Sequence, residues 1–493
     1  MARTYLYLYF SRGNGIIQIF FKEVLQMAAL FRCALFVILS VILARSGEAQ
    51  YDVSKEKSEN APRLSPNTTE EMLHPEFWIA NIKGNPDRVI LTQEQIVELN
   101  KKNSTKTYDF KDINGKPYTL RTNSLVEDPL SIRSFSGDSL RVLIKNYQRA
   151  MESGTLYDFR KKKYEDDMKK KISEQADIDA IPATVTPRYG ILVAPSSHRK
   201  FPTRNETWSE QNGWISNNSF NGLDAAAPVA VLHTSRDGGW YYVRSEFNFG
   251  WVPALEVATG SVNEIRNYVE ARDFIMVTTG KVPVYSEKAP KNFLIDLYMG
   301  ARVKLVKKTA DGCHVLVPFR KADGTFETVP GLVKPDAGVS VGYQPFTQRN
   351  IINTFFTKLN DPWSGGDAYE ARHCCGAVRG VLRTFGIKVM DSTTFQLHAS
   401  DHVISFPKET PNSVKYTCLK ECEPAVTLLG SPAHVILYLG EVNGRHYVIH
   451  STGYDYKSDD GTVMILRRVN VNDTELEGGS QIDTLTYMCQ LKP

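Results

Sequence analysis

The middle of the chain alternates short apolar runs with tight turns, and this rhythm limits what the chain can fold into. Val229–Leu232 leads into Asp237-Gly-Gly and a second apolar run, and Trp251 lies in a third. Short alternating runs separated by glycine-rich turns predict strands joined by hairpins, as in a small β-barrel. The pattern recurs 74 residues later, where Val303 and Asp311 take the places of Val229 and Asp237. We therefore expect two barrels in tandem, over residues 186–262 and 263–343.

The length of the chain leaves room for further domains on both sides of the barrels. The chain has 493 residues, of which 42% are hydrophobic and 23% charged, close to globular averages. This composition excludes a disordered chain and a multi-span membrane protein. Between residues 50 and 185, signals such as the capping-box pattern from Thr92 to Gln95 predict an N-terminal helical region. Residues 344–493 remain for a last domain.

The first 49 residues have the character of a secretory leader. Ala28–Ala44 is mostly apolar, and the small residues Gly47 and Ala49 precede Gln50. We interpret residues 1–49 as a signal peptide read from Met1 or Met27, with an uncleaved single-span anchor as the alternative. The mature protein is then expected to be secreted, or to enter the lumen of a secretory or lysosomal-type compartment. Five N-glycosylation sequons agree with a glycoprotein: Asn67, Asn103, Asn205, Asn217 and Asn472.

The leader also carries most of the charge. The formal net charge is +4, and five basic against two acidic side chains in residues 1–49 account for three of those charges. The nearly neutral remainder gives no support to a nucleic acid or an anionic membrane as partner. Six cysteines remain, too few for a disulfide-built scaffold: Cys313, Cys374, Cys375, Cys418, Cys422 and Cys489.

One of these cysteines stands where a nucleophile would be activated. A loop rich in Gly and Pro precedes Cys374, and the residues after it are apolar at helical spacing. At about 100° per residue, Cys374 lies near the centre of the apolar face, whereas Cys375 points away from that centre. Cys374 therefore opens a helix facing the interior, where the helix dipole lowers the pKa of a thiol. Two ordinary buried cysteines are the alternative.

Two histidines follow on a predicted hairpin. His434 begins one strand and His450 ends the return strand, after a turn signal at Asn443-Gly444. A thiolate nucleophile needs a base, and that base needs a group that fixes its tautomer. A two-residue turn with regular pairing would put the histidines on opposite faces of the sheet, so this interpretation requires one extra residue in the loop or in a bulge.

These features together resemble the NlpC/P60 family of cysteine peptidases. The glycine-rich turn, the cysteine at a helix start, the His-Val-x-x-Tyr-x-Gly strand and the return strand ending in His-Ser carry the resemblance. Phe385-Gly-Ile and Ser392-Thr-Thr-Phe-Gln396 are similar to a subgroup with two bacterial SH3 domains and an N-terminal helical stabilising region. The resemblance implies an α+β multidomain fold whose papain-like catalytic domain spans residues 344–493, after the barrels and a helical region over 50–185.

The same resemblance implies residue roles and a substrate. Cys374 would be the nucleophile, His434 the general base and His450 the orienting residue. The implied reaction is hydrolysis of peptidoglycan stem peptides, commonly between γ-D-glutamate and a diamino acid, by a protein without metal or organic cofactor. The barrels are expected to wall the active-site cleft. We also expect a monomer.

The chain departs from the family where the substrate's free L-Ala amine would bind. His373-Cys374-Cys375 replaces Asp-Cys-Ser, and Pro362-Trp363-Ser364-Gly365-Gly366 replaces Tyr-x-Trp-Gly-Gly. We expect Trp363, His373 and Cys375 to border the substrate. A neutral imidazole does not pair with an ammonium group as a carboxylate does, so the departures predict altered or relaxed amine recognition.

Two other functions fit the sequence, and the remaining cysteines and histidines have simpler interpretations. The chain could be a catalytically idle peptidoglycan-binding protein, or an acyltransferase or amidase acting on a substrate outside the cell wall. Cys418 and Cys422 have the spacing of half a zinc site, but a disulfide among Cys313, Cys418, Cys422 and Cys489 is favoured in a secreted chain. His398 and His402 are predicted to be polar surface residues.

Overall fold

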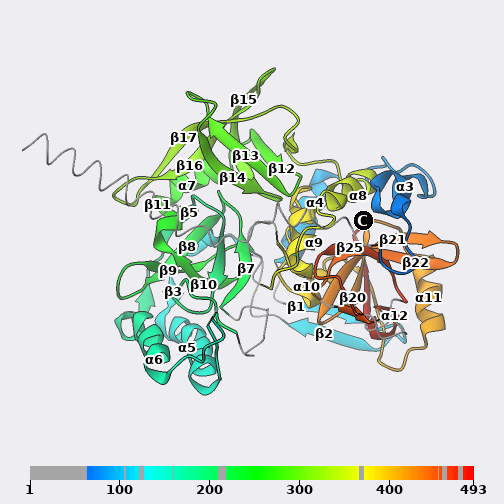
Figure 1. Cartoon of the computed structure of the whole chain (residues 1–493), viewed down its shortest axis with the longest axis horizontal. Coiled ribbons are helices and arrows are strands. Elements are labelled where there is room, and N and C mark those ends of the chain that lie inside the picture. The colour runs from blue at the N-terminus through cyan, green and yellow to red at the C-terminus, as the bar shows by residue number, and fades with distance from the viewer. Residues whose placement is uncertain are drawn as a thin grey trace, which may run out of the picture. The chain divides into compact units, whose positions relative to one another are not determined.

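The computed structural model describes residues 64–104, 107–121, 127–158, 160–208, 218–365, 371–453, 455–457, 463–475 and 481–493 (Figure 1). The expected signal peptide, the sequon at Asn217 and Gly366 of the glycine-rich turn lie outside these residues. No helix in the described ranges is long and apolar enough to cross a membrane.

The first barrel has the strands that the alternating pattern predicted. The Asp237-Gly-Gly turn joins two of them, and the Asp237 carboxylate accepts the backbone N–H of Gly239 at 2.8 Å. Val243 and Trp251 are fully buried between the strands. The sheet has the order β11-β5-β8-β9-β10-β6-β7, with bounds β5 (Arg188–Leu192), β6 (Ser196–Arg199), β7 (Ser219–Leu223), β8 (Pro228–Thr234), β9 (Trp240–Arg244), β10 (Phe249–Pro253) and β11 (Val257–Gly260).

A second sheet follows after the short helix α7 (Val262–Val269), which begins with a capping box between Ser261 and Glu264. At the position equivalent to Trp240 this sheet has His314, whose Nδ1 lies 3.0 Å from Glu287. The strand order is β14-β13-β17-β16-β15-β12-β18, with bounds β12 (Phe274–Val277), β13 (Lys281–Ser286), β14 (Phe293–Tyr298), β15 (Arg302–Thr309), β16 (Gly312–Arg320), β17 (Phe326–Val333) and β18 (Val339–Val341).

The N-terminal helical region divides its packing between two cores. Trp78 and Ile96, on α3 (Pro75–Ala80) and α4 (Gln93–Asn103), join the core of the C-terminal domain. Leu140 on α5 (Gly137–Ser153) joins the core of the first barrel. The predicted capping box at Thr92 is confirmed at the start of α4. The remaining elements are η1 (Glu70–Leu73), β1 (Thr107–Lys111), β2 (Pro117–Arg121), η2 (Pro129–Ser131), β3 (Phe135–Ser136), α6 (Asp166–Gln175), η3 (Ile178–Ala180), β4 (Thr184–Val185) and η4 (Ala254–Glu256).

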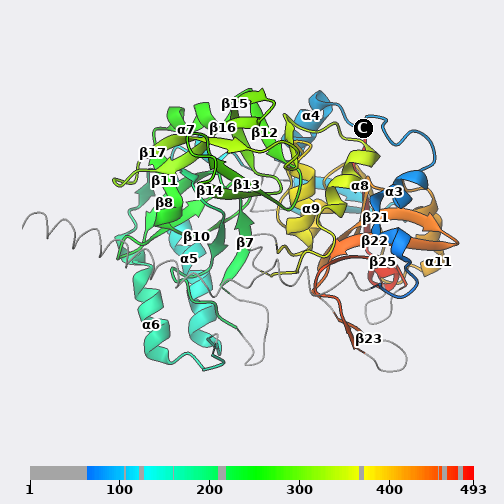
Figure 2. The same ribbon diagram turned by 45° about the horizontal axis from the view of Figure 1, so that its top comes forward.

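The C-terminal domain is a mixed α+β structure built on a six-stranded antiparallel sheet, in which β21, β22 and β25 lie side by side (Figures 1 and 2). Its strands are β19 (His402–Ser405), β20 (Thr427–Ser431), β21 (His434–Val442), β22 (Arg445–Ser451), β25 (Val469–Asp473) and β26 (Tyr487–Gln490), and β23 (Asp455–Lys457) pairs separately with β24 (Val463–Ile465). The helices are α8 (Gln348–Phe356), α9 (Cys374–Arg383), α10 (Thr393–Gln396), α11 (Asn412–Lys420) and α12 (Gln481–Thr484).

Helix α9 covers β21 and β22. Val378 and Val381 on the helix share one core with Leu437 and Ile449 on the strands. Val448, on the opposite face of β22, belongs to a second core. The alternation follows from the two-residue period of a strand, and it places the start of α9 beside the ends of the strands that carry the histidines.

Candidate active site

Cys374 is the first residue of α9, as the sequence predicted. His373 is the N-cap, and its Nδ1 accepts the backbone N–H of Gly376 at 2.9 Å. The side chains of Cys374 and Cys375 are buried, with 9% and 6% of their surfaces exposed. The pKa of Cys374 lies well below its ordinary value because of a hydrogen bond with Cys375, and also because of the hydrogen bond and charge of His434, although burial acts to raise it. The site favours a thiolate.

The hairpin that carries the two histidines contains the extra residue that the catalytic interpretation requires. Asn443-Gly444 forms a two-residue turn, with φ of 52° and 79°. The register then shifts at Leu439, which is the bulged residue of β21. His434 and His450 therefore lie on one face, and His434 Nε2 is 2.6 Å from His450 Nδ1. The geometric condition set by the sequence is met by a bulge.

Sequence reasoning missed the next residue in this chain of contacts, Asn472 on β25. His450 Nε2 lies 3.2 Å from Asn472 Oδ1, and both side chains are almost completely buried. An amide oxygen only accepts, so the proton of neutral His450 is on Nε2 and its Nδ1 accepts from His434 Nε2–H. The second nitrogen of His434 is then the one left to take the proton of Cys374. In the sequence, Asn472 was visible only as part of a sequon. The pairing of β22 with β25 shows that its side chain contacts His450.

Burial determines the protonation state of His450. The pKa of His450 is lowered to about 3, first by burial and then by the nearby charge of His434, while its hydrogen bond to Asn472 acts in the opposite direction. His450 therefore stays neutral near neutral pH and works as an acceptor of fixed tautomer. The Cys374–His434 pair can exchange a proton, which is the requirement for nucleophilic attack by sulfur.

Comparison with known proteins identifies the fold of the chain. An SH3 domain model of the SH3b1 type matches residues 218–253, which hold β7 to β10 of the first barrel. The chain is similar to the structure of a novel NlpC/P60 endopeptidase from Photobacterium damselae subsp. piscicida, with a TM-score of 0.64 and 17% sequence identity over 84% of this chain and 96% of that one. The chain has the NlpC/P60 endopeptidase fold. It is also similar to an NlpC/P60 family protein from Bacillus cereus ATCC 10987, with a TM-score of 0.40 and 16% identity over 56% of this chain and 83% of that one. No curated protein matches the sequence.

The fold class expected from the sequence is confirmed, namely an α+β NlpC/P60 domain preceded by SH3-like barrels and a helical N-terminal region. In this domain helix α9, which begins with Cys374, contacts the first barrel directly. The Asp224 carboxylate, just after β7, lies 3.3 Å from Arg372 and 3.7 Å from Arg383, which flank α9 at its two ends. Arg379, within α9, donates to the carbonyl of Gly222 on β7 at 3.0 Å.

Beside Cys374, the side chains of His373 and Cys375 form a cluster with that of Asp391, which sequence reasoning did not identify. His373 Nε2 is 3.6 Å from Asp391 Oδ1, and Asn221 of the first barrel donates to Asp391 Oδ2 at 2.8 Å. The ligand atoms of His373, Cys375 and Asp391 all lie within 4.8 Å of one another. The hydrogen bonding of His373 conflicts with a metal site. Its Nδ1 accepts the N–H of Gly376, so neutral His373 keeps its proton on Nε2 and has no free ring nitrogen for a metal ion.

Trp363 lies at the other side of the glycine-rich turn. Its backbone N–H donates to the carbonyl of Arg467 at 2.9 Å, and the neighbouring Pro362 pairs with Arg468. The N–H of Thr452, two residues after His450, also donates to Arg468. The turn therefore runs along the end of β22. The role of Trp363 at the substrate stays a prediction.

Three expectations from the sequence are corrected. His398 is buried, not on the surface: Tyr118 contacts its Nε2 at 2.9 Å, and burial lowers its pKa. His402 is exposed, as expected. Asn103 and Asn472 have 6% and 1% of their surfaces exposed, so these two sequons occupy buried positions of the folded chain.

The expected disulfide is also wrong, because no disulfide joins any of the six described cysteines. Cys313 lies on β16 of the second barrel, far in the chain from the others. Cys422 Sγ instead contacts the carbonyl of Cys418 at 3.3 Å and the sulfur of Met488 at 3.8 Å. Cys489 is fully buried in the C-terminal sheet. All six described cysteines are therefore free thiols, and none forms the disulfide that their number allowed.

Proposed function

We propose that this protein is a secreted cysteine peptidase that hydrolyses the stem peptides of bacterial peptidoglycan. The observation that carries the proposal is the continuous chain from Cys374 through His434 and His450 to Asn472, with 2.6 Å between the imidazoles and 3.2 Å between His450 and Asn472. The NlpC/P60 fold and the SH3 match support peptidoglycan as the substrate class. The expected bond is that between γ-D-glutamate and the diamino acid.

The geometry supports a two-step reaction. Cys374 gives its proton to His434, and the thiolate attacks the carbonyl carbon of the peptide bond. The backbone N–H groups of the first turn of a helix have no intrahelical acceptor, so that of Cys374 can stabilise the oxyanion. Protonated His434 then gives its proton to the leaving amine, and an acyl-enzyme remains. His434 takes a proton from water, and the resulting hydroxide releases the acid and restores the thiol.

The environment of Cys374 favours an enzyme over an idle binding protein. A structural cysteine in an apolar core has a raised pKa, as burial gives Cys422, whose pKa rises to about 12. The pKa of Cys374 is shifted in the opposite direction although it is also buried. A protein that only bound its ligand would have no use for this shift.

We propose that amine recognition differs from the Asp-Cys-Ser pattern of the family. The Asp391 carboxylate lies 3.6 Å from His373 Nε2, and it also contacts Asn221 and Arg379. The ammonium group of a substrate would meet the His373 ring, not a carboxylate. A substrate with a blocked amine is therefore expected to bind almost as well as one with a free amine.

Secretion remains part of the proposal and rests on the apolar run Ala28–Ala44 before Gly47 and Ala49. Sequencing the N-terminus of the protein recovered from a eukaryotic culture medium tests it. Cleavage after Ala49 is expected, and recovery only in the membrane fraction would favour the anchor.

The reaction is tested by incubating the protein with muramyl-free tetrapeptide stems and identifying the products by mass spectrometry. Cleavage at the γ-D-glutamyl bond is expected for the wild type and not for Cys374→Ala, with Cys489→Ala as the matched control. Iodoacetamide labelling at pH 6 gives a second readout, because it reports the thiolate fraction without a substrate. Selective labelling of Cys374 that disappears in His434→Ala is expected. Labelling without hydrolysis would indicate an acyl transfer or amide hydrolysis on another substrate.

A further inference from the structure

Cys375 stands next to the proposed nucleophile and takes no part in the two-step reaction proposed above. Cys374 and Cys375 are the first two residues of α9, both are buried, and neither forms a disulfide. A hydrogen bond joins their side chains, although the regular geometry of a helix turns adjacent side chains about 100° apart. The chain therefore brings two thiols together at the position where a thiolate is favoured.

The other four described cysteines differ from Cys374 in their acidity. Burial raises the pKa of Cys313, Cys418 and Cys489, and it raises the pKa of Cys422 to about 12. These four thiols stay protonated near neutral pH and react slowly with oxidants, because the thiolate is the reactive form. Oxidation of the folded chain is therefore expected to begin at Cys374.

The start of α9 makes a bond between the two sulfurs possible but strained. The Cα atoms of adjacent residues are about 3.8 Å apart, whereas those of ordinary disulfides are about 4.4–6.8 Å apart. The N–H groups of Cys374 and Cys375 have no acceptor within the helix. The hydrogen bond from the Ala377 N–H to the His373 carbonyl, 2.9 Å long, spans both cysteines and would be loosened by the bridge. A disulfide at this place is therefore expected to be easily reduced.

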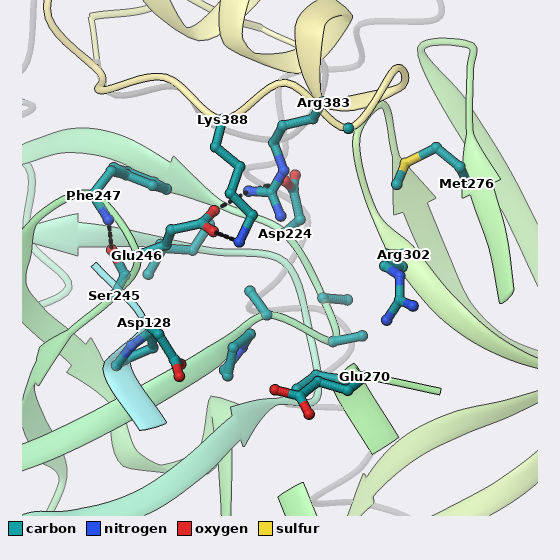
Figure 3. Close-up of a pocket in the computed structure, with 18 of the residues that line it drawn as sticks. Asp128, Asp224, Ser245, Glu246, Phe247, Glu270, Met276, Arg302, Arg383 and Lys388 are labelled. Atoms are coloured by element: carbon teal, nitrogen blue, oxygen red, sulfur yellow. Dashed lines mark hydrogen bonds and ion pairs between the residues drawn. The ribbon is translucent and has the colours of Figure 1, made fainter. Parts of the chain in front are cut away.

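The rest of α9 is anchored to the first barrel. Figure 3 shows its last residue, Arg383, beside Asp224, and the two side chains lie 3.7 Å apart. Arg379 also donates to the carbonyl of Gly222 at 3.0 Å. The distortion is therefore expected to stay within the first turn, so that the helix start can reform when the bond is reduced.

We propose that hydrogen peroxide converts Cys374 and Cys375 into a reversible disulfide between adjacent residues, which inactivates the site. The Cys374 thiolate attacks one peroxide oxygen, the O–O bond breaks, and a sulfenic acid and hydroxide result. The hydroxide takes the proton held by His434. The sulfur of Cys375 then attacks that of Cys374, and its thiol proton leaves with the hydroxyl group as a second water. Each sulfur is oxidised by one electron, and the peroxide is reduced to water.

The bond would protect the site as well as inactivate it. It removes the nucleophile, but it also stops the oxidation of Cys374 before the sulfinic acid, which small thiols do not reduce. As a means of regulation the proposal rests on the peptidase function proposed above. The bond itself is measured without a substrate.

Mass spectrometry of the tryptic peptide 373–379, which holds both cysteines, tests the proposal. After hydrogen peroxide treatment, the wild-type peptide is expected to lose two hydrogen atoms, and dithiothreitol should restore both thiols. In Cys375→Ser the peptide should instead gain two or three oxygen atoms, and dithiothreitol should not restore the Cys374 thiol. Cys418→Ser removes the one described cysteine outside the disulfide pair that is not buried, and as the matched control it should behave like the wild type.

A measurement on the wild type guards against misfolding of Cys375→Ser. Phenylarsine oxide condenses with two neighbouring thiols and releases water, so it should prevent iodoacetamide from labelling both Cys374 and Cys375. Labelling of both thiols after this treatment would overturn the proposal. Equal gains of oxygen in the wild type and Cys375→Ser, or a disulfide from Cys374 to a different cysteine, would overturn it as well. Absence of stem-peptide hydrolysis together with the expected masses would count against the proposed function alone.

Discussion

The carboxylate of Asp224 in the first barrel lies 3.3 Å from Arg372, which stands two residues before Cys374 in the NlpC/P60 domain. The carbonyl of Arg372 in turn accepts the hydroxyl of Ser451 at 2.6 Å, and Ser451 follows His450. One arginine thus joins the barrel, the start of the nucleophile helix and the end of the histidine strand. The barrel is a structural part of the candidate active site.

Asp224→Asn should test this coupling. Asp224 is 4% exposed, so the change removes a buried carboxylate that faces Arg372 and Arg383 and should lower the free energy of unfolding by about 3 kcal/mol. We expect kcat for stem-peptide cleavage to fall about tenfold with a smaller change in KM, since a displaced helix start misplaces sulfur. Asp224→Glu should restore part of kcat. Asp179→Asn, an exposed acid of the N-terminal region, should change neither value. An unchanged kcat in folded Asp224→Asn would refute the positioning role.

Asn472→Ala should separate the hydrogen-bonding role of this residue from its sequon. The change leaves the Nε2–H of buried His450 without an acceptor and should destabilise the protein by about 1–3 kcal/mol. We expect kcat to fall about tenfold, because His450 can then adopt the other tautomer. Thr474→Ala removes the sequon but keeps Asn472, so it should retain activity. Equal losses in both variants would point to glycosylation or general damage.

The free energy of unfolding should depend on pH because two histidines are buried in the folded chain. The pKa values of His450 and His198 are both lowered from 6.5 to about 3, chiefly by burial. Between pH 3 and pH 6.5 the unfolded chain therefore binds more protons than the folded chain. The free energy of unfolding falls as the pH falls from 6.5 towards 3. Each residue should cost about 2 kcal/mol at pH 5. Urea unfolding of His450→Gln and of the wild type at several pH values measures this cost. If the free energy of unfolding changed equally with pH in both proteins between pH 7 and 5, the prediction would be wrong.

His373→Asp should change amine selectivity. An aspartate keeps the N-cap function of this position, so α9 should still form. Its carboxylate can pair with the ammonium group of a free-amine stem, and we expect KM for that substrate to fall several-fold. KM for the N-acetylated stem serves as the internal control and should not fall. Wild-type protein that already rejects the acetylated stem by more than about a hundredfold would contradict the proposed relaxed recognition.

Local features of the catalytic helix and the hairpin were predictable because they depend on residues close in the chain. The apolar period after Cys374 and the cap at His373 define the start of α9, and Asn443-Gly444 defines the turn. The sequence could show that the catalytic interpretation requires one extra residue, but not that this residue is a bulge at Leu439. A one-residue shift in register leaves the apolar pattern of β21 almost unchanged.

The contacts that complete the site join residues far apart in the chain. Asn472 reaches His450 because β25 pairs with β22, and Asp391 meets His373 and Asn221 across a domain junction. His398 was predicted to be exposed, but hairpin β1–β2 from the N-terminal region covers it. The periodicity of a sequence does not indicate which segment will pack over another.

The sequence by itself determined the types and order of the elements, the residues able to form a thiolate and its base, and the tandem barrel rhythm. These follow from backbone preferences, apolar periodicity and turn chemistry, which act over a few residues. Tertiary structure alone decided that the N-terminal helices divide between two cores, that Asp224 holds α9 from another domain, and that the six described cysteines form no disulfide. Those outcomes depend on burial and charge pairing between segments that the chain order does not bring together.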